Sequence, residues 1–138
     1  MKTRRSAQGL LPGLIALAAL SGCAPEGTAA TGAAEAFHRA VASSDMTAAC
    51  SLLQPHTREE TARSSDAGTC ESQLEKEKAK FTDPGNVLRT EQYGQDAFVQ
   101  FENDAVFLAV SEGGWKVTAA GCKPNGEEAP YTCEVGGK

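Results

Sequence analysis

The most informative stretch for the fold is residues 95–122, which read Gln-Asp-Ala-Phe-Val-Gln-Phe-Glu-Asn-Asp-Ala-Val-Phe-Leu-Ala-Val-Ser-Glu-Gly-Gly-Trp-Lys-Val-Thr-Ala-Ala-Gly-Cys. Two turn signals, at residues 102–104 and 112–114, divide this apolar and β-branched stretch into three runs of strand length. We therefore expect an antiparallel meander. Side chains alternate between the two faces of a strand, so one covered face of the last run should carry Trp115, Val117 and Ala119.

Apolar residues at helical spacing indicate that helices precede the meander and cover it. Three segments carry this pattern: residues 32–43, 46–53 and 69–80. The Thr57-x-x-Glu60 spacing is that of a capping box, which predicts a brief helical turn between the second and third segments.

The change from helix to sheet is marked by the turn signal Asp83-Pro84-Gly85-Asn86. Residues 87–93 follow it and are predicted to form the first strand, which makes four strands with the meander. Helices followed by an antiparallel sheet define an α+β fold class. The remaining C-terminal residues are expected to form a polar loop that covers the sheet edge.

The N-terminal residues have the order of an export signal. Lys2, Arg4 and Arg5 precede an uncharged run that ends at Leu20, and this run is too short for a membrane span of about 20 apolar residues. Its end, Leu20-Ser21-Gly22-Cys23, resembles the bacterial lipobox, which implies that Cys23 is lipidated and becomes the first residue of the mature protein. An ordinary secretory peptide is the alternative, and the export route stays open between the general and the twin-arginine pathways.

These features predict three parts. Residues 1–22 are the lipoprotein signal peptide, residues 23–31 are the lipidated cysteine with a flexible tether, and residues 32–138 form a single α+β domain. The expected location is the extracytoplasmic face of the cell membrane, because two or more acyl chains on Cys23 give stable anchoring.

The net charge of the mature chain argues against two kinds of contact. All 18 acidic residues follow Cys23, whereas three of the 13 basic residues precede it, so the mature chain carries 10 minus 18, or −8. Such a balance argues against nucleic acid and against a polybasic membrane contact. The expected partners are the membrane, through the anchor on Cys23, and an unidentified envelope protein or small ligand.

Four cysteines remain after Cys23, an even number in an oxidising compartment, and they predict two disulfides. Of the three possible connectivities we expect Cys50 with Cys70 and Cys122 with Cys133, because each pair flanks a turn-rich loop in one structural region. A zinc site is the alternative, but no Cys-x-x-Cys is present and spacings of 20 and 11 do not suit a zinc ribbon. No metal and no cofactor are expected.

Several short motifs between residues 34 and 137 carry a resemblance to a known family. They are residues 37–41, Cys50-Ser51-Leu52-Leu53, Tyr93-Gly94-x-x-Ala97, Gly114-Trp115-Lys116-Val117-Thr118-Ala119-Ala120-Gly121-Cys122 and residues 130–137. Together they resemble small uncharacterised actinobacterial lipoproteins with a nuclear-transport-factor-2-like (cystatin-like) domain. The resemblance implies N-terminal helices packed on a curved antiparallel sheet, so the expected fold is α+β, with these helices on a curved four-stranded sheet and the two disulfides predicted above. It implies no particular reaction.

The expected function is a non-enzymatic binding or interaction module, with a cleft lined by Tyr93, Phe101 and Trp115 at one end of the sheet. One alternative is a small enzyme of the cyclase or isomerase type, which the same superfamily contains, and another is an accessory regulator of an envelope complex. Such an enzyme needs a buried acid or base.

The candidate acids and bases are His38, His56, Asp96 and Asp104. Both histidines are expected to be solvated, and both aspartates to lie in turns where Asp bonds the local backbone. No catalytic residue is therefore predicted.

Overall fold

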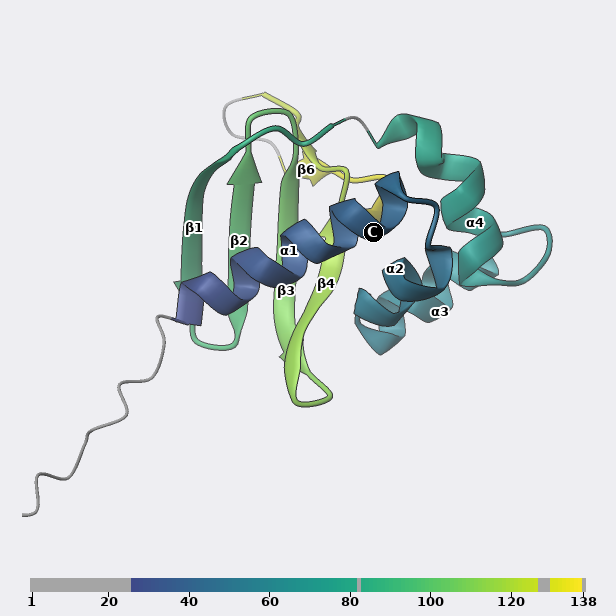
Figure 1. Ribbon diagram of the computed structural model, residues 1–138, viewed down its shortest axis with the longest axis horizontal. Helices are drawn as coiled ribbons and strands as arrows, with labels where there is room; N and C mark the ends of the chain where they lie inside the picture. The colour runs from purple at the N-terminus through teal and green to yellow at the C-terminus, as the bar shows by residue number, and fades with distance from the viewer. Residues whose placement is uncertain (1–25, 82, 127–129, 138) are drawn as a thin grey trace, which may run out of the picture.

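One long helix crosses a face of an antiparallel sheet, and three shorter helices are grouped beside one edge of the sheet, in the computed structural model, which describes residues 26–81, 83–126 and 130–137 (Figure 1). The helices are α1 (Glu26–Ala42), α2 (Met46–Leu52), α3 (Pro55–Arg63) and α4 (Cys70–Glu77), and a 3-10 turn, η1 (Lys78–Lys80), extends α4. The main strands are β1 (Val87–Tyr93), β2 (Asp96–Phe101), β3 (Ala105–Ser111) and β4 (Gly114–Ala120). The predicted α+β class and the antiparallel meander are confirmed.

The sheet has five strands rather than the four predicted. Its order is β1-β2-β3-β4-β7, where β7 (Val135–Gly136) pairs antiparallel with β4. A separate ribbon joins β5 (Lys123–Pro124) to β6 (Tyr131–Thr132). A strand of two residues is too short to show alternation, so the sequence pattern could not reveal β7. The expectation that the C-terminal segment covers the sheet edge is correct, but it does so by strand pairing.

Helix α1 begins at Glu26, six residues before its predicted start at residue 32. The flexible tether expected over residues 24–31 is therefore wrong from Glu26 onward, and Cys23 lies outside the described residues. Ala30 in this first part of α1 is fully buried, and the Thr31 hydroxyl lies 2.7 Å from the Thr90 hydroxyl of β1. Residues 26–31 have the composition of a linker, but they are helical because they pack against the sheet.

A bulge in β4 changes which side chains face the helices. Phe107 pairs with Ala119 but its neighbour Leu108 pairs with Val117, so Thr118 has no partner in β3. Ala119 therefore faces the side of the sheet away from the helices, contrary to the prediction that it shares a face with Val117. Ala120 takes its place in the main core.

The predicted capping box is also wrong. Thr57 lies inside α3, which begins two residues earlier at Pro55, and its hydroxyl donates a hydrogen bond of 3.1 Å to the Thr118 carbonyl at the bulge. Proline is favoured in the first turn of a helix because no hydrogen bond to its nitrogen is needed there. The first turn of α3 thus supplies a hydrogen-bond donor to the extra residue of β4, Thr118.

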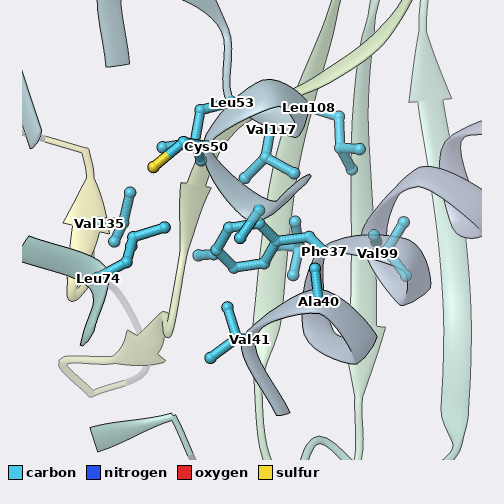
Figure 2. Packing of buried hydrophobic residues seen from close by; sticks show 14 of the residues in the cluster. Phe37, Ala40, Val41, Cys50, Leu53, Leu74, Val99, Leu108, Val117 and Val135 are labelled. Atoms are coloured by element: carbon cyan, nitrogen blue, oxygen red, sulfur yellow. The ribbon is translucent and has the colours of Figure 1, made fainter. Parts of the chain in front are cut away.

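The core lies between α1 and the sheet (Figure 2). The ring of Phe37 is fully buried at the centre of the labelled side chains, with Val99, Leu108 and Val117 contributed by three different strands. Burying a side chain of this size stabilises the fold by about 2–3 kcal/mol.

Both predicted disulfides are present, Cys50–Cys70 and Cys122–Cys133. The first joins α2 to α4 and belongs to the core, and the second joins the segment after β4 to the segment before β7. The zinc alternative is excluded because these four cysteines have no free thiolate.

Candidate ligand pocket

A pocket of about 480 Å³ opens where α1 ends and the chain enters β1. Its apolar wall comes from Val41, Ala42, Phe81, Pro84 and Phe101. The polar residues Glu35, His38, Arg39, Lys78 and Asp83, together with Gly85, complete it. Pockets of 300–1,000 Å³ with apolar walls and a few polar groups are typical of small-molecule sites.

His38 is the buried polar group in this pocket, with 6% of its surface exposed. Its ring packs edge-on against Phe101, with the ring centroids 5.1 Å apart. The expectation that His38 is solvated is therefore wrong. A signal was present, because His38 follows the buried Ala34 by four residues and precedes the buried Val41 by three, which places all three on one helix face.

Asp104, at the turn between β2 and β3, approaches His38 from the sheet. Its Oδ2 lies 2.8 Å from His38 Nε2, and the residue is only 8% exposed. The ring N–H does not point along this line, so the contact is electrostatic rather than an aligned hydrogen bond. Asp104 was expected to bond its local backbone, but its side chain instead spans from one end of the sheet to α1.

The Asp104 carboxylate is only partly satisfied. The Gly121 N–H donates to Oδ2 at 3.4 Å, a long hydrogen bond, and Oδ1 accepts none from the described residues. A buried carboxylate with a free oxygen beside a histidine is costly in a core, and groups of this kind concentrate at binding and catalytic sites.

The charges at the pocket mouth are matched within the protein. Arg39 lies 4.0 Å from Glu35, and Lys78 contacts the Ser44 hydroxyl. Asp83 accepts a hydrogen bond of 3.0 Å from the Gly85 N–H. The mouth thus holds both signs of charge without a marked excess, and His38 is the polar group left at the apolar wall.

The remaining candidate acid and base are at the surface. His56, on α3, is solvated as predicted, with its side chain 68% exposed and Nδ1 3.7 Å from Glu60 Oε2. Asp96 begins β2 and is exposed. Neither residue approaches the His38 pocket, so of the four candidates only His38 and Asp104 come together.

The three residues expected to line one cleft lie apart. Phe101 is in the wall of the pocket just described, at the carboxyl end of β2. Tyr93 is 68% exposed at the opposite end of the sheet, where it lines a separate hollow of about 310 Å³. Trp115 is the second residue of β4, is half-buried and packs against the main core. Neighbouring antiparallel strands run in opposite directions, so the end of β2 lies at the opposite end of the sheet from the end of β1 and the start of β4. Phe101 is therefore far from Tyr93 and Trp115.

Within the described parts of the chain, no helix is long and apolar enough to cross a membrane. The same residues contain no group of three or more His, Cys, Asp or Glu side chains that could hold a metal ion. Comparisons with protein-family models, with curated proteins and with solved structures found no match to this chain.

Proposed function

We propose that this protein is a lipid-anchored binding module on the extracytoplasmic face of the cell membrane, and that its His38 pocket takes a small amphipathic ligand. The observation that carries the proposal is the burial of His38 beside Asp104 in the apolar wall of a pocket of about 480 Å³. The expected interaction site thus moves from the Tyr93 end of the sheet to the Phe101 end.

The proposed location outside the cytoplasm is supported by the N-terminal sequence and by the disulfides. The Leu20-Ser21-Gly22-Cys23 quartet follows a charged and then apolar leader, and resembles the lipobox. Two disulfides suit an oxidising compartment outside the cytoplasm. A nuclear-transport-factor-2-like fold, in which the sheet curves around a cavity below the first helix, agrees with α1 lying over the sheet and with a pocket at one end of their interface.

The chemistry of the pocket specifies the ligand class. Phe81 and Phe101 offer ring surfaces to an apolar body, and each 100 Å² of apolar surface buried there contributes roughly 2.5 kcal/mol before the costs of binding. His38 Nε2 faces Asp104, which leaves Nδ1 for a polar group of the ligand. We expect a molecule with one hydroxyl, amide or carbonyl group on a ring or short aliphatic body.

The two histidines provide a matched test of binding. Ligands selected by thermal shift from a library of small amphipathic molecules are titrated calorimetrically into wild type, His38→Ala and His56→Ala. Binding lost in His38→Ala and kept in His56→Ala supports the proposal. Equal affinities for the three proteins would place the binding site elsewhere.

A second candidate, an enzyme that transfers a proton at His38, is favoured by the same His38–Asp104 contact. A histidine nitrogen in the wall of a pocket lies where it can exchange a proton with a bound substrate, and the Asp104 carboxylate lies 2.8 Å behind the ring. Turnover of a bound ketone or polyketide-like compound that disappears in both His38→Ala and His38→Gln would establish it. Binding without turnover leaves the first proposal standing.

The remaining candidate function is interaction with an envelope protein, for example as an accessory regulator of an envelope complex. A lipid anchor confines the domain to the membrane surface and raises its effective concentration toward partners fixed there. Crosslinking in intact cells, followed by mass spectrometry, tests this possibility: a specific partner that is captured by wild type and lost on Cys23→Ala supports it.

A further inference from the structure

The start of α1 fixes which end of the domain lies near its proposed anchor. A Cβ atom built on Gly27 would lie 3.6 Å from Thr90 Cγ2 of β1, and the hydroxyls of Thr31 and Thr90 lie 2.7 Å apart. Figure 1 shows this first turn of α1 beside the end of the sheet where β1 turns into β2. The opposite end of α1 carries His38 and borders the pocket.

Very little chain separates Cys23 from this first turn. Only residues 24 and 25 lie between Cys23 and the beginning of α1 at Glu26, and three residue steps span at most about 10–11 Å. A lipid on Cys23 would therefore hold the β1–β2 end of the domain within about that distance of the bilayer surface.

Apolar and aromatic side chains are exposed at this same end. Tyr93 is 68% exposed at the end of β1, and Val110 is 42% exposed near the end of β3. Trp115 pairs with Val110 across the β3–β4 hairpin and is half-buried. Tyrosine and tryptophan favour membrane interfaces, because their rings are apolar while the hydroxyl or the ring N–H stays hydrated.

We infer that the end of the sheet formed by the β1–β2 and β3–β4 hairpins, with Tyr93, Val110 and Trp115, is the face that rests on the phospholipid bilayer. This inference rests on the anchor at Cys23 in the proposed function. Asp96 and Glu112 lie at the same hairpins, so attraction to anionic headgroups does not hold this face on the membrane, and the anchor is required.

This orientation has a consequence for the pocket. Phe101 and His38 lie at the other end of the sheet and of α1, so the pocket opens away from the bilayer. The ligand is then taken from the aqueous side rather than from the membrane.

The chain contains a single tryptophan, Trp115, which makes the orientation measurable. The full-length lipidated protein is reconstituted into phosphatidylcholine–phosphatidylglycerol vesicles whose lipids carry a nitroxide on the headgroup. Flotation reports anchoring, and loss of Trp115 emission reports proximity to the bilayer. The matched control is Trp115→Phe with Ala79→Trp, because Ala79 is exposed on η1 near the pocket.

We expect strong quenching of Trp115 and little quenching of the Ala79→Trp control, with equal flotation. A flexible Gly-Ser insertion after Pro25 should abolish the quenching and keep the flotation. Equal quenching at both positions, or none at Trp115 in floated protein, overturns the orientation while leaving the anchor intact. Protein that does not float and has an unmodified Cys23 overturns the anchor and the orientation together, yet leaves ligand binding at His38 unaffected.

Discussion

The imidazole of His38 and the carboxylate of Asp104 approach within 2.8 Å, although 66 residues separate them along the chain and each is more than nine-tenths buried. This contact joins the last turns of α1 to the turn between β2 and β3. His38 itself lines the pocket, and Asp104 lies directly behind it. Stability and ligand binding are therefore expected to depend on the same pair.

Asp104→Ala should destabilise the domain by about 1–3 kcal/mol, because it removes the acceptor of the Gly121 N–H and the carboxylate next to the buried His38 Nε2. Asn103→Ala is the matched control, since Asn103 lies in the same turn and is exposed. Denaturant unfolding of the three proteins measures the difference. An Asp104→Ala protein as stable as the control would show that the contact contributes nothing to folding.

Gly136→Ala should destabilise the domain more than Gly94→Ala does. Both glycines have a positive φ, +67° and +62°, so both substitutions share a backbone strain of about 1–2 kcal/mol. Only at Gly136 would the new Cβ collide, 1.9 Å from the Thr118 carbonyl oxygen. Thermal melts of the two variants provide the comparison, and equal melting temperatures would contradict the close pairing of β7 with β4.

Replacing both members of a disulfide should cost about 3 kcal/mol in either case on the loop-entropy model, because the cost depends only on the logarithm of the loop length and the separations are 20 and 11 residues. The Cys50→Ala/Cys70→Ala protein should lose more than this, because its sulfurs lie in the main core. Unfolding of the two double variants tests the ranking. Peptide mapping without reduction checks the pairing itself, and a peptide that joins Cys50 to Cys133 would refute it.

The pKa of Tyr93 is raised above its ordinary value, first by the hydrogen bond that its hydroxyl donates to Glu91 and then by the negative charge of Glu91. A raised pKa means that the contact stabilises the fold while Tyr93 is protonated, and that this contribution is lost as the pH rises through the folded-state pKa. Glu91→Gln should therefore lower the pKa of Tyr93. Ultraviolet titration in a Tyr131→Phe background measures it, and an unchanged midpoint would rule out the contact in solution.

Local patterns in the sequence were sufficient to predict β1 to β4, but not the two-residue strand β7. Residues 87–93 were predicted as a strand and form β1 with the same bounds, because a strong turn signal precedes them and alternation continues to Tyr93. The disulfides were also predictable, since each links cysteines that are near in sequence on either side of a loop.

Features that depend on tertiary contacts were not predictable in this way. The bulge at Thr118 moves Ala119 to the other face, and nothing in the alternation of residues 114–120 announces it. The early start of α1 depends on Thr31 meeting Thr90. The His38–Asp104 contact joins a helix to a distant turn, so each residue examined alone suggested an ordinary surface role.

Binding of a small amphipathic ligand in the His38 pocket can be measured by a fragment screen of the isotopically labelled mature domain with two-dimensional NMR. Fragments with one polar group should shift the resonances of His38, Phe81 and Phe101, and the same fragments should leave the spectrum of His38→Ala unchanged in this region. Fragment-induced shifts that cluster away from these residues, or that persist in His38→Ala, would contradict binding in this pocket.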